Sequence, residues 1–154
     1  MKAVILSGGS GQRLAPLTNT ITKQLLPVAN RPTLFHILDL IKEETPIKSI
    51  CVVVSEEYGH KVKEELTNSE HSKYFQFDFV FQDKPLGLAH AVQITSMHMN
   101  DDPFLMFLGD ILINKGAQVR YASVLVPEKD SVQYLGRDST DAMVDFMGLS
   151  SALV

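Results

Sequence analysis

Only one cysteine, Cys51, occurs among the 154 residues, so no disulfide can form within the chain. No apolar run approaches the ~20 residues of a membrane-spanning helix, and the apolar stretch at residues 3–6 is too short for a signal peptide. The net charge is −4, so the chain lacks the basic excess that attracts nucleic acid or anionic lipid. These absences favour a reduced, cytoplasmic protein that binds neither nucleic acid nor membrane.

Strand and helix patterns alternate along most of the chain. Apolar or alternating runs predict strands at 3–6, 50–54, 75–81, 104–108 and 122–126. Helical spacing of apolar residues predicts helices at 34–41, 58–66 and 87–99, the first with Thr33 as its N-cap. Three prolines make residues 12–33 an ordered excursion rather than a helix, and after about residue 127 we expect no further regular strand. The alternation predicts an α/β, Rossmann-like three-layer fold with a mostly parallel sheet.

Alternation within 75–81 places four phenylalanines on one face of a predicted strand. We interpret them as a core face under a helix rather than as a platform for stacking bases.

Three chemically capable features lie where predicted strands end. A glycine-rich loop follows residue 6, Gln82 ends the third strand, and Asp110 follows the fourth. Because ligands in parallel α/β sheets bind at the carboxyl ends of strands, we expect these features to form one site.

The loop Ser7-Gly8-Gly9-Ser10-Gly11-Gln12-Arg13 follows a strand, so its backbone N–H groups can face an anion. A Walker A loop ends in Gly-Lys-Ser/Thr, whereas this loop ends in Gly-Gln-Arg. A dinucleotide-binding fingerprint needs a third glycine where Leu14 stands. The sequence therefore excludes both common kinds of glycine-rich phosphate loop.

Three short motifs follow one another after the first predicted strand. They are Gly-Gly-Ser-Gly-Gln-Arg-Leu-Ala-Pro-Leu-Thr at residues 8–18, Lys-Gln-Leu-Leu-Pro-Val at 23–28 and Arg-Pro at 31–32. In order and spacing this string resembles the signature of sugar-1-phosphate nucleotidyltransferases, most closely the glucose-1-phosphate thymidylyltransferases. The resemblance implies a fold of the nucleotide-diphospho-sugar transferase type, truncated here. It also implies transfer from dTTP or UTP to a sugar-1-phosphate, with glucose-1-phosphate as the expected acceptor and pyrophosphate as the leaving group.

The resemblance further implies roles for individual residues. Arg13 and Lys23 are expected to be catalytic, because a guanidinium fork and an ammonium point charge can hold the reacting phosphates. The expected nucleotide-binding residues are Leu6, Gly8, Gly9, Ser10, Gly11, Gln12, Arg13, Gln82, Pro85 and Gly87. Gln82 offers a donor and an acceptor that suit the imide edge of thymine or uracil. His90 is expected to pack its helix rather than to bind a ligand.

Asp110 is expected to bind Mg²⁺, the implied cofactor, which bridges triphosphate oxygens. The aspartate ends the run Phe107-Leu108-Gly109-Asp110, which resembles the family's metal-binding motif. Ile111 follows it, where the family more often has a polar residue.

The resemblance covers residues 1–113, with a likeness to the family's next strand at 122–126. We therefore expect a nucleotide-binding core at 1–127 and an unrecognised segment at 128–154. The family's helix between 113 and 121 is expected to be shortened or missing, and most of the sugar pocket and a second metal-binding aspartate have no counterpart. Three functions stay open: a short transferase, a nucleotide-binding module without turnover, or a regulatory partner of a full-length paralogue. Self-association into a homo-oligomer is also open.

Overall fold

The structure of the chain is a computed structural model, and it describes residues 1–84, 86–99, 103–112, 123–128 and 131–135. Pro85, the segment in which the family's helix was expected to be shortened or missing (113–121) and the C-terminal residues 136–154 lie outside the described residues.

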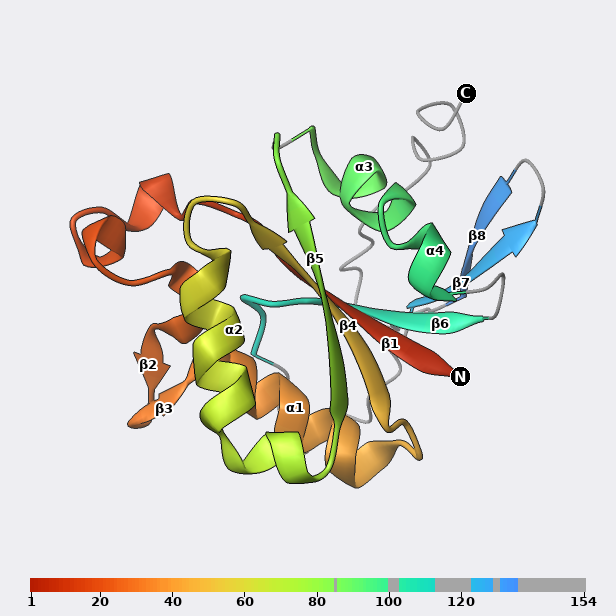
Figure 1. Cartoon of the computed structure of the whole chain (residues 1–154), viewed down its shortest axis with the longest axis horizontal. Helices are drawn as coiled ribbons and strands as arrows, with labels where there is room; N and C mark the ends of the chain where they lie inside the picture. The colour runs from red at the N-terminus through yellow and green to blue at the C-terminus, as the bar shows by residue number, and fades with distance from the viewer. Residues whose placement is uncertain (85, 100–102, 113–122, 129–130, 136–154) are drawn as a thin grey trace, which may run out of the picture.

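A six-stranded sheet forms the centre of the fold (Figure 1). Its strands are β1 (Lys2–Ser7), β4 (Ser49–Ser55), β5 (Gln76–Gln82), β6 (Phe104–Leu108), β7 (Ser123–Glu128) and β8 (Ser131–Leu135). They lie in the order β5-β4-β1-β6-β7-β8, in which the first four are parallel and β7 is antiparallel to both of its neighbours. β1 and β4 are almost unbroken apolar runs because both of their faces are buried. The prediction of a mostly parallel sheet is confirmed.

Helices cover both faces of the sheet (Figure 1). They are α1 (Thr33–Glu44), α2 (Gly59–Asn68), α3 (Leu88–Gln93) and α4 (Ser96–Met99). Buried residues of α1 and α2 cluster with Ile5 and Val52, whereas those of α3 and α4 cluster with Val4 and Val53. Successive residues of a strand point to opposite faces, so this division gives the predicted three layers.

The phenylalanines of β5 belong to the core, as predicted. Phe77, Phe79 and Phe81 are half-buried against the cluster that includes α1 and α2. Phe75 is buried immediately before the strand. Their alternation therefore reflects packing under α2 rather than a binding surface.

Residues 12–33 form the predicted excursion. It contains three 3₁₀ turns, η1 (Gln12–Leu14), η2 (Leu17–Asn19) and η3 (Lys23–Leu25), and a hairpin of β2 (Pro27–Val28) and β3 (Arg31–Pro32). The hairpin turns at Ala29 and Asn30, whose φ values are 50° and 61°. Two successive residues with positive φ give the backbone twist of a tight type I′ turn.

Thr33 does not cap α1, contrary to the prediction. It is the first residue of the helix, and Pro32 occupies the N-cap position without a side-chain cap. The Thr33 hydroxyl instead donates to the Leu26 carbonyl oxygen at 2.9 Å. The threonine therefore joins the start of α1 to the end of the excursion.

Two further expectations were wrong. The single helix expected at 87–99 is divided into α3 and α4 by a turn at Thr95. Thr95 is fully buried, and its hydroxyl donates to the Val92 carbonyl oxygen at 2.7 Å, a local bond that competes with continuation of the helix. β8 was not expected after residue 127; it forms by antiparallel pairing with β7. Such pairing depends on the neighbouring strand and is not encoded in the periodicity of five residues.

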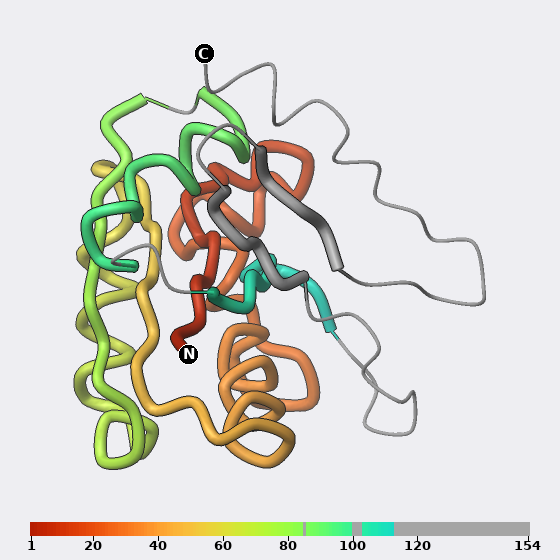
Figure 2. Tube along the Cα trace, turned by 90° about the vertical axis from the view of Figure 1, so that its right-hand side faces the viewer, coloured from red at the N-terminus to blue at the C-terminus, as the bar shows by residue number. Residues whose placement is uncertain are grey.

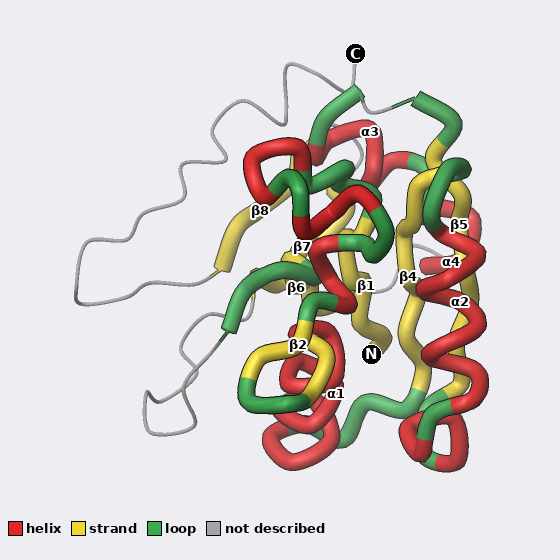
Figure 3. The backbone as a smooth tube through the Cα atoms, turned by 90° about the vertical axis from the view of Figure 1, so that its left-hand side faces the viewer, coloured by secondary structure: helices red, strands yellow, loops and turns green. Residues whose placement is uncertain are grey.

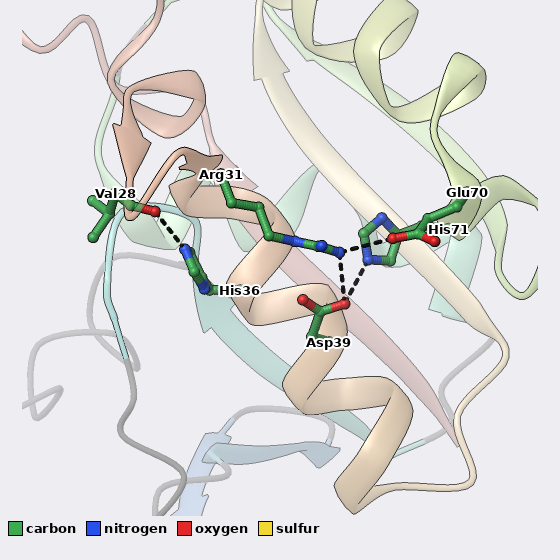
Figure 4. Close-up of polar contacts among 6 residues, drawn as sticks. All are labelled: Val28, Arg31, His36, Asp39, Glu70 and His71. Atoms are coloured by element: carbon green, nitrogen blue, oxygen red, sulfur yellow. Dashed lines mark hydrogen bonds and ion pairs between the residues drawn. The ribbon is translucent and has the colours of Figure 1, made fainter.

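An ionic cluster fastens the β2–β3 hairpin to two helices (Figure 4). Arg31 Nη2 donates to Asp39 Oδ1 of α1 at 3.1 Å and to Glu70 Oε1 of the short helix η4 (Glu70–Lys73) at 3.0 Å. His71 Nε2 lies 2.9 Å from the same Asp39 oxygen, which can only accept a hydrogen bond when ionised. The hairpin is thereby held beside α1, as Figure 3 shows.

Replacing Asp39 is expected to destabilise the fold. Asp39→Ala should lower the free energy of unfolding by about 1–3 kcal/mol, because the buried His71 side chain loses its hydrogen-bond partner. Glu70→Ala is the matched control, since the Glu70 side chain is 69% exposed and its ion pair should contribute less than about 1 kcal/mol. Urea denaturation of both variants measures the difference, and equal losses would contradict this role of Asp39.

No helix among the described residues has the length and apolar character needed to cross a bilayer.

Cys51 is buried in β4, and burial together with the Asp78 carboxylate raises the pKa of its thiol to about 12. The thiol is therefore protonated at neutral pH and is not an activated nucleophile.

Candidate nucleotide-binding site

β1 lies at the point where the order of the sheet reverses. The chain adds β4 on one side of β1 and later β6 on the other side (Figure 2). Crevices at the carboxyl ends of strands beside such a reversal are the usual ligand sites of open α/β sheets. The glycine loop follows β1, Gln82 ends β5, and Asp110 follows β6. The three features predicted to share a site therefore lie at one edge of the sheet.

The Lys23 side chain packs directly against the glycine loop. A Cβ atom added to Gly9 would lie 2.8 Å from both Cε and Nζ of Lys23. Gly11 has a φ of 69°, and a Cβ there would lie 2.8 Å from Thr18 Cγ2. The Thr18 hydroxyl donates to the Gly11 carbonyl oxygen at 2.9 Å. Glycine is needed at position 11 because its backbone is left-handed and the excursion folds back onto it, whereas a Cβ at position 9 would meet only the flexible end of Lys23.

Lys23 Nζ also forms an ion pair and a hydrogen bond with Asp110 Oδ2. The two residues are 87 positions apart in the chain, so only the sheet order brings them together. Their side chains are 23% and 37% exposed, so both groups remain accessible to a ligand. The lysine thus connects the glycine loop to the end of β6.

Gly109 allows β6 to approach β1 closely. Its N–H donates to the Leu6 carbonyl oxygen at 2.9 Å. A Cβ on Gly109 would overlap Ser7 Oγ and would lie 3.2 Å from Gln24 Cγ. The glycine therefore places Asp110 beside the loop that follows β1.

Arg13 lies at the exposed side of the loop, within η1. Among the described residues it forms no hydrogen bond or ion pair, so its guanidinium is available to an anion. Ser10 and Gln12 are also exposed, whereas the Leu6 side chain is buried in the core. The structure thus brings Arg13 and the loop together, but Leu6 faces the packing rather than the crevice.

Gln82 is buried, with 7% of its surface exposed. Its Oε1 would lie 2.9 Å from a Cβ on Gly8, so the amide lies against the start of the glycine loop. Its Nε2 lies 2.9 Å from His90 Nδ1 of α3. His90 was expected to pack its helix rather than to bind a ligand; the structure adds a contact with Gln82 that the sequence reasoning did not predict.

Gly87 provides an open backbone position before α3. Its φ is 95° with a ψ of −177°, a conformation that essentially only glycine adopts, and a Cβ there would meet no atom within 4 Å. A flat ligand can approach such a position closely. Pro85, the other residue predicted in this turn, lies outside the described residues.

Three buried polar atoms in and beside the site lack a hydrogen-bond partner among the described residues: Ser7 Oγ, Thr22 Oγ1 and Gln24 Oε1. Buried polar atoms without partners are rare, and those that occur call for an explanation such as a ligand or ordered water. Gln24 was not predicted as a site residue; its signal in the sequence is its position next to Lys23, within the motif that spans residues 8–32.

The described residues contain no group of three or more His, Cys, Asp or Glu side chains that could enclose a metal ion. Asp110 is a single accessible carboxylate at a strand end. This donor set suits Mg²⁺, which usually takes one or two carboxylates and completes its octahedron with phosphate oxygens and water.

Known proteins are similar to this chain in sequence and in fold. The nucleotidyltransferase Agl11 of low-salt glycan biosynthesis in Haloferax volcanii is 43% identical over 119 residues, which are 75% of this chain and 32% of that protein. A glucose-1-phosphate thymidylyltransferase of Streptomyces antibioticus is 40% identical over 117 residues, again 75% and 32%. The solved structure of a UTP-bound UGPase from Acinetobacter baumannii superimposes with a TM-score of 0.63 at 26% identity, over 75% of this chain and 47% of that one.

The chain spans about a third of the length of these curated relatives. A family model described as nucleotidyl transferase matches residues 2–134. That range includes the glycine loop, Lys23, Gln82 and Asp110, the features that the fold gathers at one sheet edge. The chain belongs to the nucleotidyl transferase family.

Proposed function

We propose that the chain binds a pyrimidine nucleoside triphosphate, dTTP or UTP, for transfer of its nucleotidyl group to a sugar-1-phosphate, with glucose-1-phosphate as the acceptor. An oxygen of the sugar phosphate forms a bond to the α-phosphorus. The bond from that phosphorus to the oxygen bridging to the β-phosphorus breaks, and pyrophosphate leaves. The products are a nucleoside-diphosphate sugar and pyrophosphate.

The contact of Lys23 with both the glycine loop and Asp110 carries this proposal. It joins a cation, a carboxylate and a set of backbone N–H groups at the edge where α/β sheets bind ligands. Phosphoryl transfer depends mainly on positioning and on neutralising charge, rather than on a covalent protein intermediate. These groups are of the kinds that such a transfer requires.

Arg13 and Lys23 share the phosphates in this proposal. The free guanidinium of Arg13 contacts two oxygens at once and stabilises the leaving pyrophosphate. Lys23 lies deeper, against Gly9, and contacts the reacting phosphates. Asp110 would hold Mg²⁺, which supplies neutralisation of the triphosphate charge when bound.

Gln82 reads the base in this proposal. Its amide offers an acceptor and a donor side by side, which match N3–H and O4 of thymine or uracil. The open backbone at Gly87 leaves room for the ring. This arrangement supports a pyrimidine with an imide edge.

Removal of Arg13 tests the phosphate site. Arg13→Ala should weaken dTTP binding by about 1.5–3 kcal/mol, the range of a hydrogen bond to a charged group. Lys48→Ala is the matched control, because it removes one positive charge at the opposite, amino-terminal end of β4. Isothermal titration calorimetry measures both, and an unchanged dissociation constant in Arg13→Ala would remove this residue from the site.

A second candidate function is nucleotide binding without turnover. It is favoured by one observation: the cations and the carboxylate that the described residues bring together are groups suited to the triphosphate. Incubation with dTTP, glucose-1-phosphate and Mg²⁺, followed by measurement of pyrophosphate, distinguishes a transferase from a binding module.

A further inference from the structure

The orientation of the Gln82 side-chain amide decides which base it can read. One end of a carboxamide only accepts hydrogen bonds and the other end only donates them. Thymine and uracil present the donor N3–H beside the acceptor O4. Cytosine presents the acceptor N3 beside a donating 4-amino group. Rotation of the amide by half a turn therefore converts a match for uracil into a match for cytosine.

In the structure the amide nitrogen of Gln82, rather than its oxygen, faces the ring of His90. Gln82 Nε2 lies 2.9 Å from His90 Nδ1, and since an amide nitrogen only donates, the ring nitrogen must accept. The ring proton is then on Nε2 of His90. The opposite orientation would place Oε1 against Nδ1 and would need the ring proton on that nitrogen, so the orientation of the amide is tied to the ring nitrogen that carries the proton.

The remaining atoms of the amide are available to a ligand. One hydrogen on Nε2 is given to His90, which leaves the second hydrogen as a donor and Oε1 as an acceptor. His90 projects from α3, directly after the open backbone of Gly87. The segment from Gly87 to His90 thus supplies both the space beside the base and the hydrogen-bond partner that orients the Gln82 amide.

We propose that His90 is a positioning residue for base specificity: it fixes the amide of Gln82 so that the site selects the imide edge of thymine or uracil against cytosine. This inference rests on the proposed nucleotide site. His90 acts through Gln82 and need not touch the nucleotide.

The test uses dUTP and dCTP, which differ only at the base edge that Gln82 is proposed to read. The unchanged protein should prefer dUTP by about tenfold or more, the discrimination expected of one bidentate base contact. The variants are His90→Asp and His90→Asn, which are nearly equal in size. An aspartate carboxylate only accepts and should keep the amide fixed, whereas an asparagine can pair with either end of it.

We expect His90→Asp to retain the preference for dUTP and His90→Asn to lose most of it. The added negative charge of His90→Asp weakens the binding of both nucleotides to the same extent. This effect therefore cancels in the ratio of their dissociation constants. Thermal unfolding of both variants checks the fold. A preference in His90→Asn as large as in the unchanged protein, or equal binding of dUTP and dCTP by the unchanged protein, would overturn this inference while leaving the phosphate site standing. Failure of the unchanged protein to bind either triphosphate would overturn the proposed function as well.

A ligand-free measurement tests the same bond. Nitrogen-15 NMR of the imidazole should find the proton of neutral His90 on Nε2, and Gln82→Leu should reduce that preference. A neutral ring that carries its proton on Nδ1 in the unchanged protein would overturn the inference, whatever the nucleotide affinities.

Discussion

Nucleotidyl transfer by the 154-residue chain alone is expected to be about three to four powers of ten slower than transfer by longer members of the family, although nucleotide binding is retained. The described residues supply the loop, two cations and one carboxylate, all suited to the triphosphate. The sugar phosphate needs its own cation and pocket. The residues compared with the curated relatives cover about a third of those proteins.

The size of the deficit follows from positioning. Proximity and orientation contribute ~7–11 kcal/mol to a reaction of two bound substrates. Loss of about half of that contribution slows the reaction by about three to four powers of ten, at 1.36 kcal/mol for each power. Nucleotide affinity should change much less, because the protein groups proposed to bind the triphosphate are present in this chain.

The measurement is formation of radiolabelled nucleotide sugar from α-labelled dTTP and glucose-1-phosphate, with the Streptomyces antibioticus relative assayed in parallel. Asp110→Asn is the control for contaminating enzyme, since the residual activity of this chain should disappear in that variant. A rate within about tenfold of the relative, abolished by Asp110→Asn, would establish a compact and complete enzyme instead.

Loss of Lys23 should weaken nucleotide binding more than loss of Arg13. Without Mg²⁺, Lys23→Met should raise the dissociation constant of dTTP by more than about a hundredfold, or over about 3 kcal/mol. The variant loses a hydrogen bond to a phosphate, and it also leaves the Asp110 carboxylate without its cation beside a polyanion. Arg13 has no such acidic partner among the described residues, so its removal lacks the second effect.

Mg²⁺ and Asp110→Asn should each reverse part of this loss. The metal neutralises the carboxylate that Lys23 leaves behind, and the asparagine removes its charge. Calorimetry of the single and double variants, with and without Mg²⁺, gives the coupling between the two side chains. In Asp110→Asn the gain in dTTP affinity from Mg²⁺ should fall by about tenfold or more. Strictly additive effects of Lys23→Met and Asp110→Asn would show that their contact does not matter to the nucleotide.

The central strands could be predicted from the sequence because their residues are buried on both faces. Residues 3–6, 50–54 and 104–108 are runs of apolar side chains, and each became the core of β1, β4 or β6. The glycine loop and Asp110 could be placed at strand ends for the same reason, since each directly follows such a run. Features encoded by neighbours in the chain were therefore predicted well.

Features that depend on a distant or competing partner were missed. Thr33 has the composition of an N-cap, but its hydroxyl is taken by Leu26. The helix pattern at 87–99 continues through Thr95, but that buried hydroxyl bonds to a local carbonyl and the helix divides. The edge strand β8 exists through its pairing with β7. In each case a tertiary or local hydrogen bond outweighed a weak intrinsic preference.

The residue types of the candidate site were determined by the sequence itself: glycines after a strand, Arg13 and Lys23 in fixed spacing, Gln82 and Asp110 at later strand ends. Only the tertiary structure decided which of them touch. The sheet order placed β6 beside β1 and so joined Lys23 to Asp110, and the turn before α3 brought His90 to Gln82. Local periodicity reports which face of an element is buried, whereas a contact between side chains depends on how separate elements are packed, which no short segment encodes.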